Sequence, residues 1–90
     1  MITKKEEIEM NEDMYLFAFG KDRSFFYEND YDTIRNFLSE NYFCDGLYYR
    51  TKLLTTLLHS DSLLLPDKKQ RKEFLEKSGE LQKYLSQLPI

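Results

Sequence analysis

Apolar residues recur along this chain every three or four positions, the spacing that places side chains on one face of an α-helix. In the most apolar segment, residues 47–65, leucine occupies seven of the positions from Leu53 onward. On a helix, its apolar face would comprise Leu47, Thr51, Leu54 and Leu58, widened by Tyr49, Leu53 and Leu57. So broad a face needs neighbours on several sides, and we therefore predict a central helix over residues 46–59.

A first helix is predicted over residues 4–19. Thr3 and Glu6 have the spacing of a capping box at its start, and Gly20 follows its end, where a left-handed backbone costs glycine little. Its main apolar face comprises Ile8, Tyr15 and Phe19, and beside that face lie Met10, Met14, Phe17 and Ala18. The alternative is a β-hairpin over residues 14–27, which would make the fold α+β.

Two further helices are predicted over residues 31–42 and 67–88. Each begins at an aspartate that can serve as the N-cap, Asp30 or Asp67. The amphipathic spacing of both segments is regular, which supports helix in each case.

The connectors between these helices are short. The segment Cys44-Asp45-Gly46 is typical of a turn, and Ser60-Asp61-Ser62 is typical of a helix end. The pattern therefore predicts one all-α domain over residues 1–90, a compact bundle of about four helices.

Composition favours helix over sheet. Valine is absent and isoleucine occurs only four times, whereas leucine, lysine and glutamate are common. No apolar run approaches the roughly 20 residues that cross a bilayer, so we expect no membrane span. The charged start of the chain and its single cysteine, Cys44, favour a cytoplasmic location.

Charge is divided unevenly between the two halves. Residues 1–45 carry 11 acidic and 5 basic side chains, and residues 46–90 carry 5 acidic and 8 basic ones. The acidic half would attract a partner protein with a basic surface, or the basic half of a second copy. A mixed, solvated surface accounts for the same counts.

Catalytic chemistry finds little support in the sequence. His59 and Cys44 are the only residues of their types, and nothing in their spacing brings them together as base and nucleophile. The carboxylate pairs are typical of solvated helix faces, and the three glycines lie too far apart for a phosphate-binding loop. We therefore expect no enzyme, no metal site and no cofactor.

Aromatic residues are concentrated in one part of the chain: twelve of the fourteen lie between Tyr15 and Tyr49. Tyrosine and phenylalanine are enriched at protein interfaces, but they also complete the core of a valine-free protein. Both interpretations stay open. The rings nearest the connectors are the candidate partner-binding residues: Phe25, Phe26, Tyr27, Tyr31, Tyr42 and Phe43.

A second functional hypothesis is nucleic-acid binding. The predicted helices 31–42 and 46–59, with the turn between them, have the lengths of a helix-turn-helix. The polar and basic side chains suited to phosphate and base contacts are Tyr48, Arg50, Lys52, Lys68, Lys69, Arg71 and Lys72. The net charge of −3 argues against this hypothesis.

The last half of the chain carries one resemblance. The 90-residue length of the chain, its helical pattern and the residues Glu73-Phe74, Glu76 and Tyr84-Leu85 resemble the AsiA family of phage anti-sigma proteins, which are all-α inhibitors that bind an RNA polymerase sigma factor. The resemblance implies a phage inhibitor and assigns no site residue. The first half of the chain shows nothing comparable.

Together these observations predict a small, non-catalytic protein-binding module, an inhibitor or modulator of a larger host or viral complex. The alternatives are a helix-turn-helix protein and a self-associating structural module.

Overall fold

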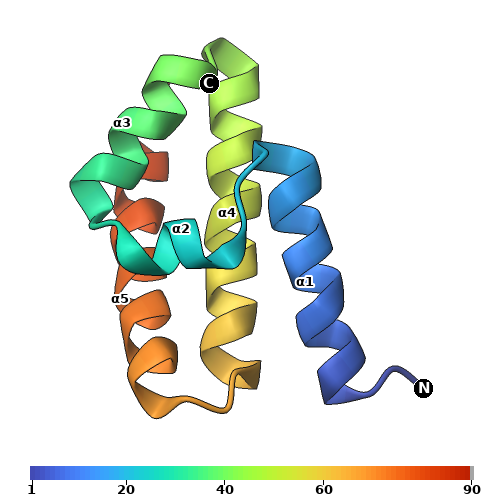
Figure 1. Cartoon of the computed structure of the whole chain (residues 1–90). Helices are drawn as coiled ribbons and strands as arrows, with labels where there is room; N and C mark the ends of the chain where they lie inside the picture. The colour runs from blue at the N-terminus through green and yellow to red at the C-terminus, as the bar shows by residue number, and fades with distance from the viewer. Residues whose placement is uncertain (90) are drawn as a thin grey trace.

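Five helices account for most of residues 1–89, the part of the chain that this computed structural model describes (Figure 1). They are α1 (Lys4–Phe19), α2 (Arg23–Glu28), α3 (Tyr31–Asn41), α4 (Cys44–Leu64) and α5 (Lys68–Gln87). No strand occurs among residues 1–89, so the all-α prediction is confirmed and the hairpin over residues 14–27 is wrong. The four longer helices correspond to the four predicted ones, and the short α2 is additional.

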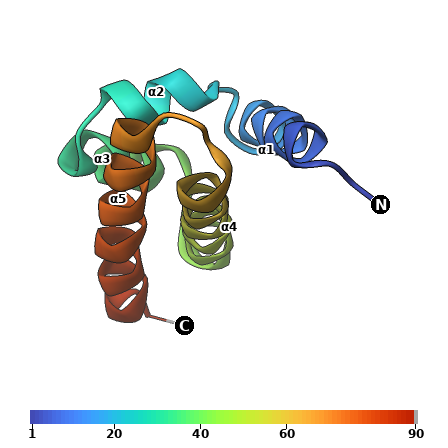
Figure 2. The ribbon, with the colours of Figure 1, turned by 90° about the horizontal axis from the view of Figure 1, so that it is seen from below.

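Helices α4 and α5 form an antiparallel pair at the centre of the fold, and α4 also contacts α1 and α3 (Figures 1 and 2). Helix α1 lies on the side of α4 away from α5, α3 lies against both α4 and α5, and α2 lies against α5. The radius of gyration is 12.6 Å, close to the value of about 12 Å expected for a compact chain of this length. The predicted central role of the leucine-rich helix is confirmed.

Local capping signals fix where the helices begin and end. The backbone N–H of Glu6 donates to Thr3 Oγ1 at 3.1 Å and that of Thr3 to Glu6 Oε1 at 3.2 Å, which completes the predicted capping box. Gly20 closes α1 with φ of 69°, in the left-handed region. The carboxylates of Asp30 and Asp67 accept from backbone N–H groups at the starts of α3 and α5.

The predicted bounds of the central helix need correction, because α4 is longer at both ends than residues 46–59. It begins at Cys44, so Cys44-Asp45-Gly46 is not a turn, and Phe43 is its N-cap. Ser60-Asp61-Ser62 lies inside the helix, because the Asp61 carboxylate bonds to other helices instead of to nearby backbone. The helix ends only where Pro66 holds the preceding residue in an extended conformation.

The core lies where all five helices meet. Its fully buried side chains come from every helix: Tyr15, Phe26, Ile34, Leu38, Leu54, Leu58, Phe74 and Leu81. The predicted face of the central helix is confirmed except at Tyr49, which is 63% exposed.

Candidate partner-binding surfaces

Most of the aromatic rings predicted at a partner-binding surface belong to the core. Phe26 is fully buried, and Phe25, Tyr27, Tyr31 and Tyr42 are half-buried and pack against it or its neighbours. Of the two interpretations that the sequence leaves open for these rings, packing against the core therefore describes these five. Phe43, the sixth candidate, is 76% exposed on the connector before α4.

The position of α2 explains why its rings are buried, because the helix turns its aromatic side chains inward between α1 and α3. The ring of Phe26 lies 5.4 Å from Tyr15, 5.5 Å from Phe19, 5.1 Å from Phe25 and 6.3 Å from Phe37, measured between centroids. Such edge-on and offset contacts stabilise aromatic pairs beyond the burial of their area. The aromatic excess of the first half is therefore mainly core.

A buried carboxylate holds α1 and α2 against α4. Asp61 is fully buried, and its oxygens accept from Tyr15 Oη at 2.7 Å, Arg23 Nε at 2.8 Å and Asn11 Nδ2 at 2.9 Å. The Arg23 guanidinium also donates to the carbonyl of Ile8 at 2.7 Å. Side chains of α1 and α2 thus bond to one carboxylate on α4. A charged group is tolerated inside a protein when its oxygens accept hydrogen bonds in this way.

The contacts of this network shift the pKa values of Tyr15 and Arg23. Burial, followed by the charge and hydrogen bond of Asp61, raises the pKa of Tyr15 far above its usual range, so Tyr15 stays a neutral donor. Burial works to lower the pKa of Arg23, but the hydrogen bond and charge of Asp61 outweigh it and raise that pKa. Tyr15 and Arg23 therefore keep the same protonation states across the neutral pH range.

The opposite face of α1 carries apolar side chains that are exposed to solvent. Met10 is 53% exposed, Met14 39% and Phe17 88%. Their spacing of four and three residues places them on one line, directly opposite the buried Tyr15 and the half-buried Ile8. The sequence pattern predicts these three residues beside the buried face, and the structure corrects this prediction because it exposes them on the opposite side of the helix. We call Met10, Met14 and Phe17 the outer stripe.

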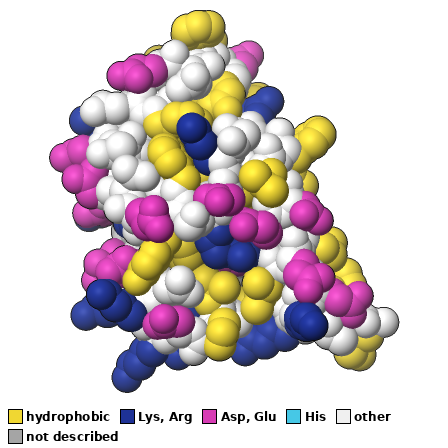
Figure 3. Space-filling model, in the orientation of Figure 1, with side chains coloured by type: hydrophobic (Ala, Val, Ile, Leu, Met, Phe, Trp, Pro, Cys, Tyr) yellow, Lys and Arg dark blue, Asp and Glu magenta, His cyan; other side chains and the backbone are white. Residues whose placement is uncertain are grey.

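Acidic side chains border the outer stripe. Glu6 and Asp13 lie along one side of it and Glu7 along the other, and all three are exposed. Figure 3 shows apolar and acidic side chains next to each other along the flank of the molecule formed by α1. The border is part of the acidic excess of the first half of the chain.

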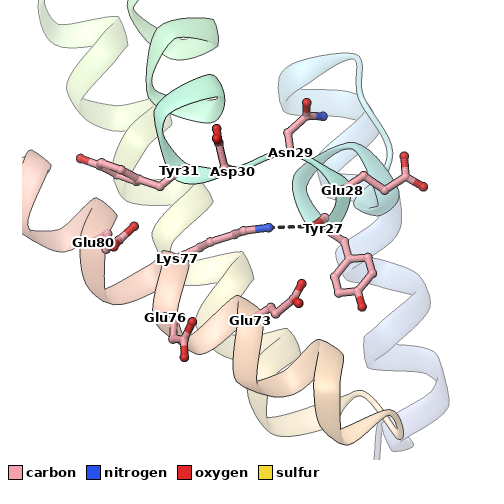
Figure 4. Close-up of a pocket in the computed structure, with 9 residues that line it drawn as sticks. All are labelled: Tyr27, Glu28, Asn29, Asp30, Tyr31, Glu73, Glu76, Lys77 and Glu80. Atoms are coloured by element: carbon pink, nitrogen blue, oxygen red, sulfur yellow. Dashed lines mark hydrogen bonds between the residues drawn. The ribbon is translucent and has the colours of Figure 1, made fainter.

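A second feature is an acidic hollow of about 350 Å³ between α5 and the turn that joins α2 to α3 (Figure 4). The Lys77 ammonium at its centre donates to the carbonyls of Phe26 at 2.9 Å and Tyr27 at 2.8 Å. These two hydrogen bonds cap the C-terminal end of α2. Desolvation lowers the pKa of Lys77, although Glu73 and Asp30 oppose that effect. The hollow is lined by Tyr27, Glu28, Asn29, Asp30, Tyr31, Glu73, Glu76, Lys77 and Glu80.

The predicted nucleic-acid residues do not form one surface. Arg50 donates to the carbonyl of Ala18 and lies 5.1 Å from the centroid of the Tyr42 ring, while Arg71 bonds to the carbonyls of Leu65 and Pro66. Both guanidinium groups are therefore engaged in contacts within the protein. Of the remaining residues, Tyr48 and Lys52 lie in the first half of α4, and Lys68, Lys69 and Lys72 lie at the opposite end of the α4–α5 pair (Figure 1).

The two residues considered as a catalytic base and nucleophile also lie far from each other. Cys44 and His59 are both exposed and lie fifteen positions apart on α4, about 22 Å along its axis. Within residues 1–89, no group of three or more His, Cys, Asp or Glu side chains could hold a metal ion. None of the helices described has the length and apolar character of a membrane span.

The chain matches no protein-family model, no curated protein and no solved structure. The resemblance of its last half to the AsiA family therefore gains no support from these comparisons. The outer stripe is the candidate partner-binding surface of this protein.

Proposed function

We propose that this protein is a non-catalytic protein-binding module that docks the outer stripe of α1 on a larger protein complex. The observation that carries the proposal is a helix whose inner face is fully engaged by the fold and whose outer face exposes three adjacent apolar side chains. Contiguous exposed apolar side chains mark interaction sites in proteins that are otherwise well packed. By occupying a surface of the complex, the protein would inhibit or modulate it.

The residue types of the outer stripe suit such a role. Phe17 offers a large, rigid ring for a pocket, and the flexible thioethers of Met10 and Met14 adapt to irregular surfaces. Positions i, i+4 and i+7 are the anchors that a helix uses when it lies in a groove of another protein.

The proposal is tested by capture from a lysate of the source cells. We expect the double variant Met10→Gln with Phe17→Ser to bind the captured protein roughly 30-fold more weakly than the natural chain, because two anchors are lost. The matched control is Leu75→Gln on α5, because Leu75 is 53% exposed, as Met10 is. Affinity is measured by biolayer interferometry and folding by circular dichroism.

Two results would refute the proposal. In the first, the double variant and the control bind the captured protein equally well. In the second, only Leu75→Gln loses binding, which would move the site to α5.

A further inference from the structure

The border of the outer stripe specifies the chemistry of its occupant. Glu6, Glu7 and Asp13 are exposed, and within residues 1–89 none of them takes part in an ion pair. Glu6 Oε1 accepts from Thr3 in the capping box, so the negative charge that faces whatever covers the stripe is mainly that of Glu7 and Asp13. We infer that the occupant is a protein surface with an apolar groove whose rim carries lysine or arginine; this inference rests on the proposed function.

The shape of α1 supports a groove as the counterpart. The three anchors span eight residues, about 10 Å along a convex helix that projects from the flank of the molecule (Figure 2). A convex helix in contact with a flat surface buries little area, whereas a groove encloses half of its circumference. The apolar stripe would then lie at the bottom of the groove, and the carboxylates would lie at the level of its rim.

Charge argues against two other occupants: a second copy that presents the same stripe, and an anionic membrane. A second copy of this chain that docked the same stripe would bring the Asp13 carboxylates and their neighbours together, and like charges disfavour such an interface. An anionic membrane surface would be repelled by the same carboxylates. The basic rim is the arrangement that the observed charges favour.

The inference is tested with a displayed library of a three-helix scaffold in which the outward positions of two adjacent helices are randomised. Clones are selected on the full-length natural chain and counter-selected on the Met10→Gln with Phe17→Ser variant, so that binders of the stripe are enriched. We expect these clones to carry several-fold more lysine and arginine than aspartate and glutamate at the edges of their helix pair.

A charge-neutralised variant gives the second readout. Glu7→Gln with Asp13→Asn should bind the selected clones about 3- to 10-fold more weakly at low salt, and high salt should remove the difference. The matched control, Glu9→Gln with Glu40→Gln, has the same net charge but leaves the border intact, and it should bind as the natural chain does. Glu6 is left unchanged because it caps α1.

Each outcome decides a separate claim. Stripe-dependent clones with neutral or acidic edges, or with no response to the border variant, overturn the basic rim and leave the docking function standing. A selection in which every clone binds another face also overturns the inferred groove. The docking function itself fails only in the capture experiment with the natural partner, so the two failures are distinguishable. Dimers of the natural chain that the stripe variant lacks would instead make a second copy the occupant.

Discussion

The two faces of α1 differ in how their side chains are satisfied. The inner face places Tyr15 in the core and joins it to Asp61 through a buried hydrogen bond of 2.7 Å. The outer face leaves the Phe17 ring 88% exposed, two positions further along the same helix. The difference shows that one helix can be fixed rigidly by one side while it presents the other side to a partner. A surface presented in this way loses little conformational entropy on binding.

The largest expected effect separates two phenylalanines that the sequence alone does not distinguish. Phe26→Ala should lower the free energy of unfolding by about 3–5 kcal/mol, because it leaves a cavity among four neighbouring rings. Phe17→Ala should change it by no more than about 0.5 kcal/mol, because the ring packs on little. Urea unfolding of both variants measures the contrast, and equal losses would show that the outer face is packed after all.

The next effect concerns the charge that holds the inner face. Asp61→Asn should cost about 3 kcal/mol, because it removes the counter-charge of the partly buried Arg23 and a strong acceptor of Tyr15. The exposed Asp13→Asn is the matched control and should stay within about 0.5 kcal/mol. If both substitutions cost the same small amount in urea unfolding, Asp61 does not fix α1.

The smallest effect is a dependence on alkaline pH. The pKa of Tyr15 in the folded state is raised by burial and by Asp61, so its contribution to stability is complete below the unfolded pKa of 10.0 and is lost as pH rises above it. Between pH 10 and 11, the natural chain should lose about 1 kcal/mol more stability than Tyr15→Phe, which cannot ionise. Other titrating groups cancel in this comparison.

Tyr15→Phe has its own cost at neutral pH, about 1–3 kcal/mol, because Asp61 loses a buried donor. The pH effect is therefore measured as the slope of the unfolding free energy against pH. Equal slopes for the natural chain and the variant would place the Tyr15 hydroxyl in water.

The sequence predicts those parts of this fold that are determined locally. The caps at Thr3, Gly20, Asp30 and Asp67 depend on residues two to four positions away, and all of them are confirmed. The sequence predicts a helix end at Ser60-Asp61-Ser62, because serine and aspartate usually bond to nearby backbone. The side-chain partners of Asp61 are instead 38 to 50 residues away, a distance that no local pattern records.

The candidate surface was missed for a related reason. Met10, Met14 and Phe17 repeat at helical spacing, but so do Ile8 and Tyr15 on the other side of the same helix. Periodicity identifies both faces as apolar and does not say which one packs on α4. The signal that could have found the surface is the presence of two opposed apolar lines on one helix, since a helix at the edge of a small bundle buries only one of them.

The sharing of Asp61 by three helices has a consequence for how such a chain can evolve. A substitution of Asp61 removes the acceptor of Asn11, Tyr15 and Arg23 together, and a substitution of any one of these three leaves the buried carboxylate with one donor fewer. These four positions should therefore change in a correlated way in descendants of this sequence. Positions 10, 14 and 17 carry no such mutual constraint. Each of them can therefore be substituted independently when the surface of a binding partner changes.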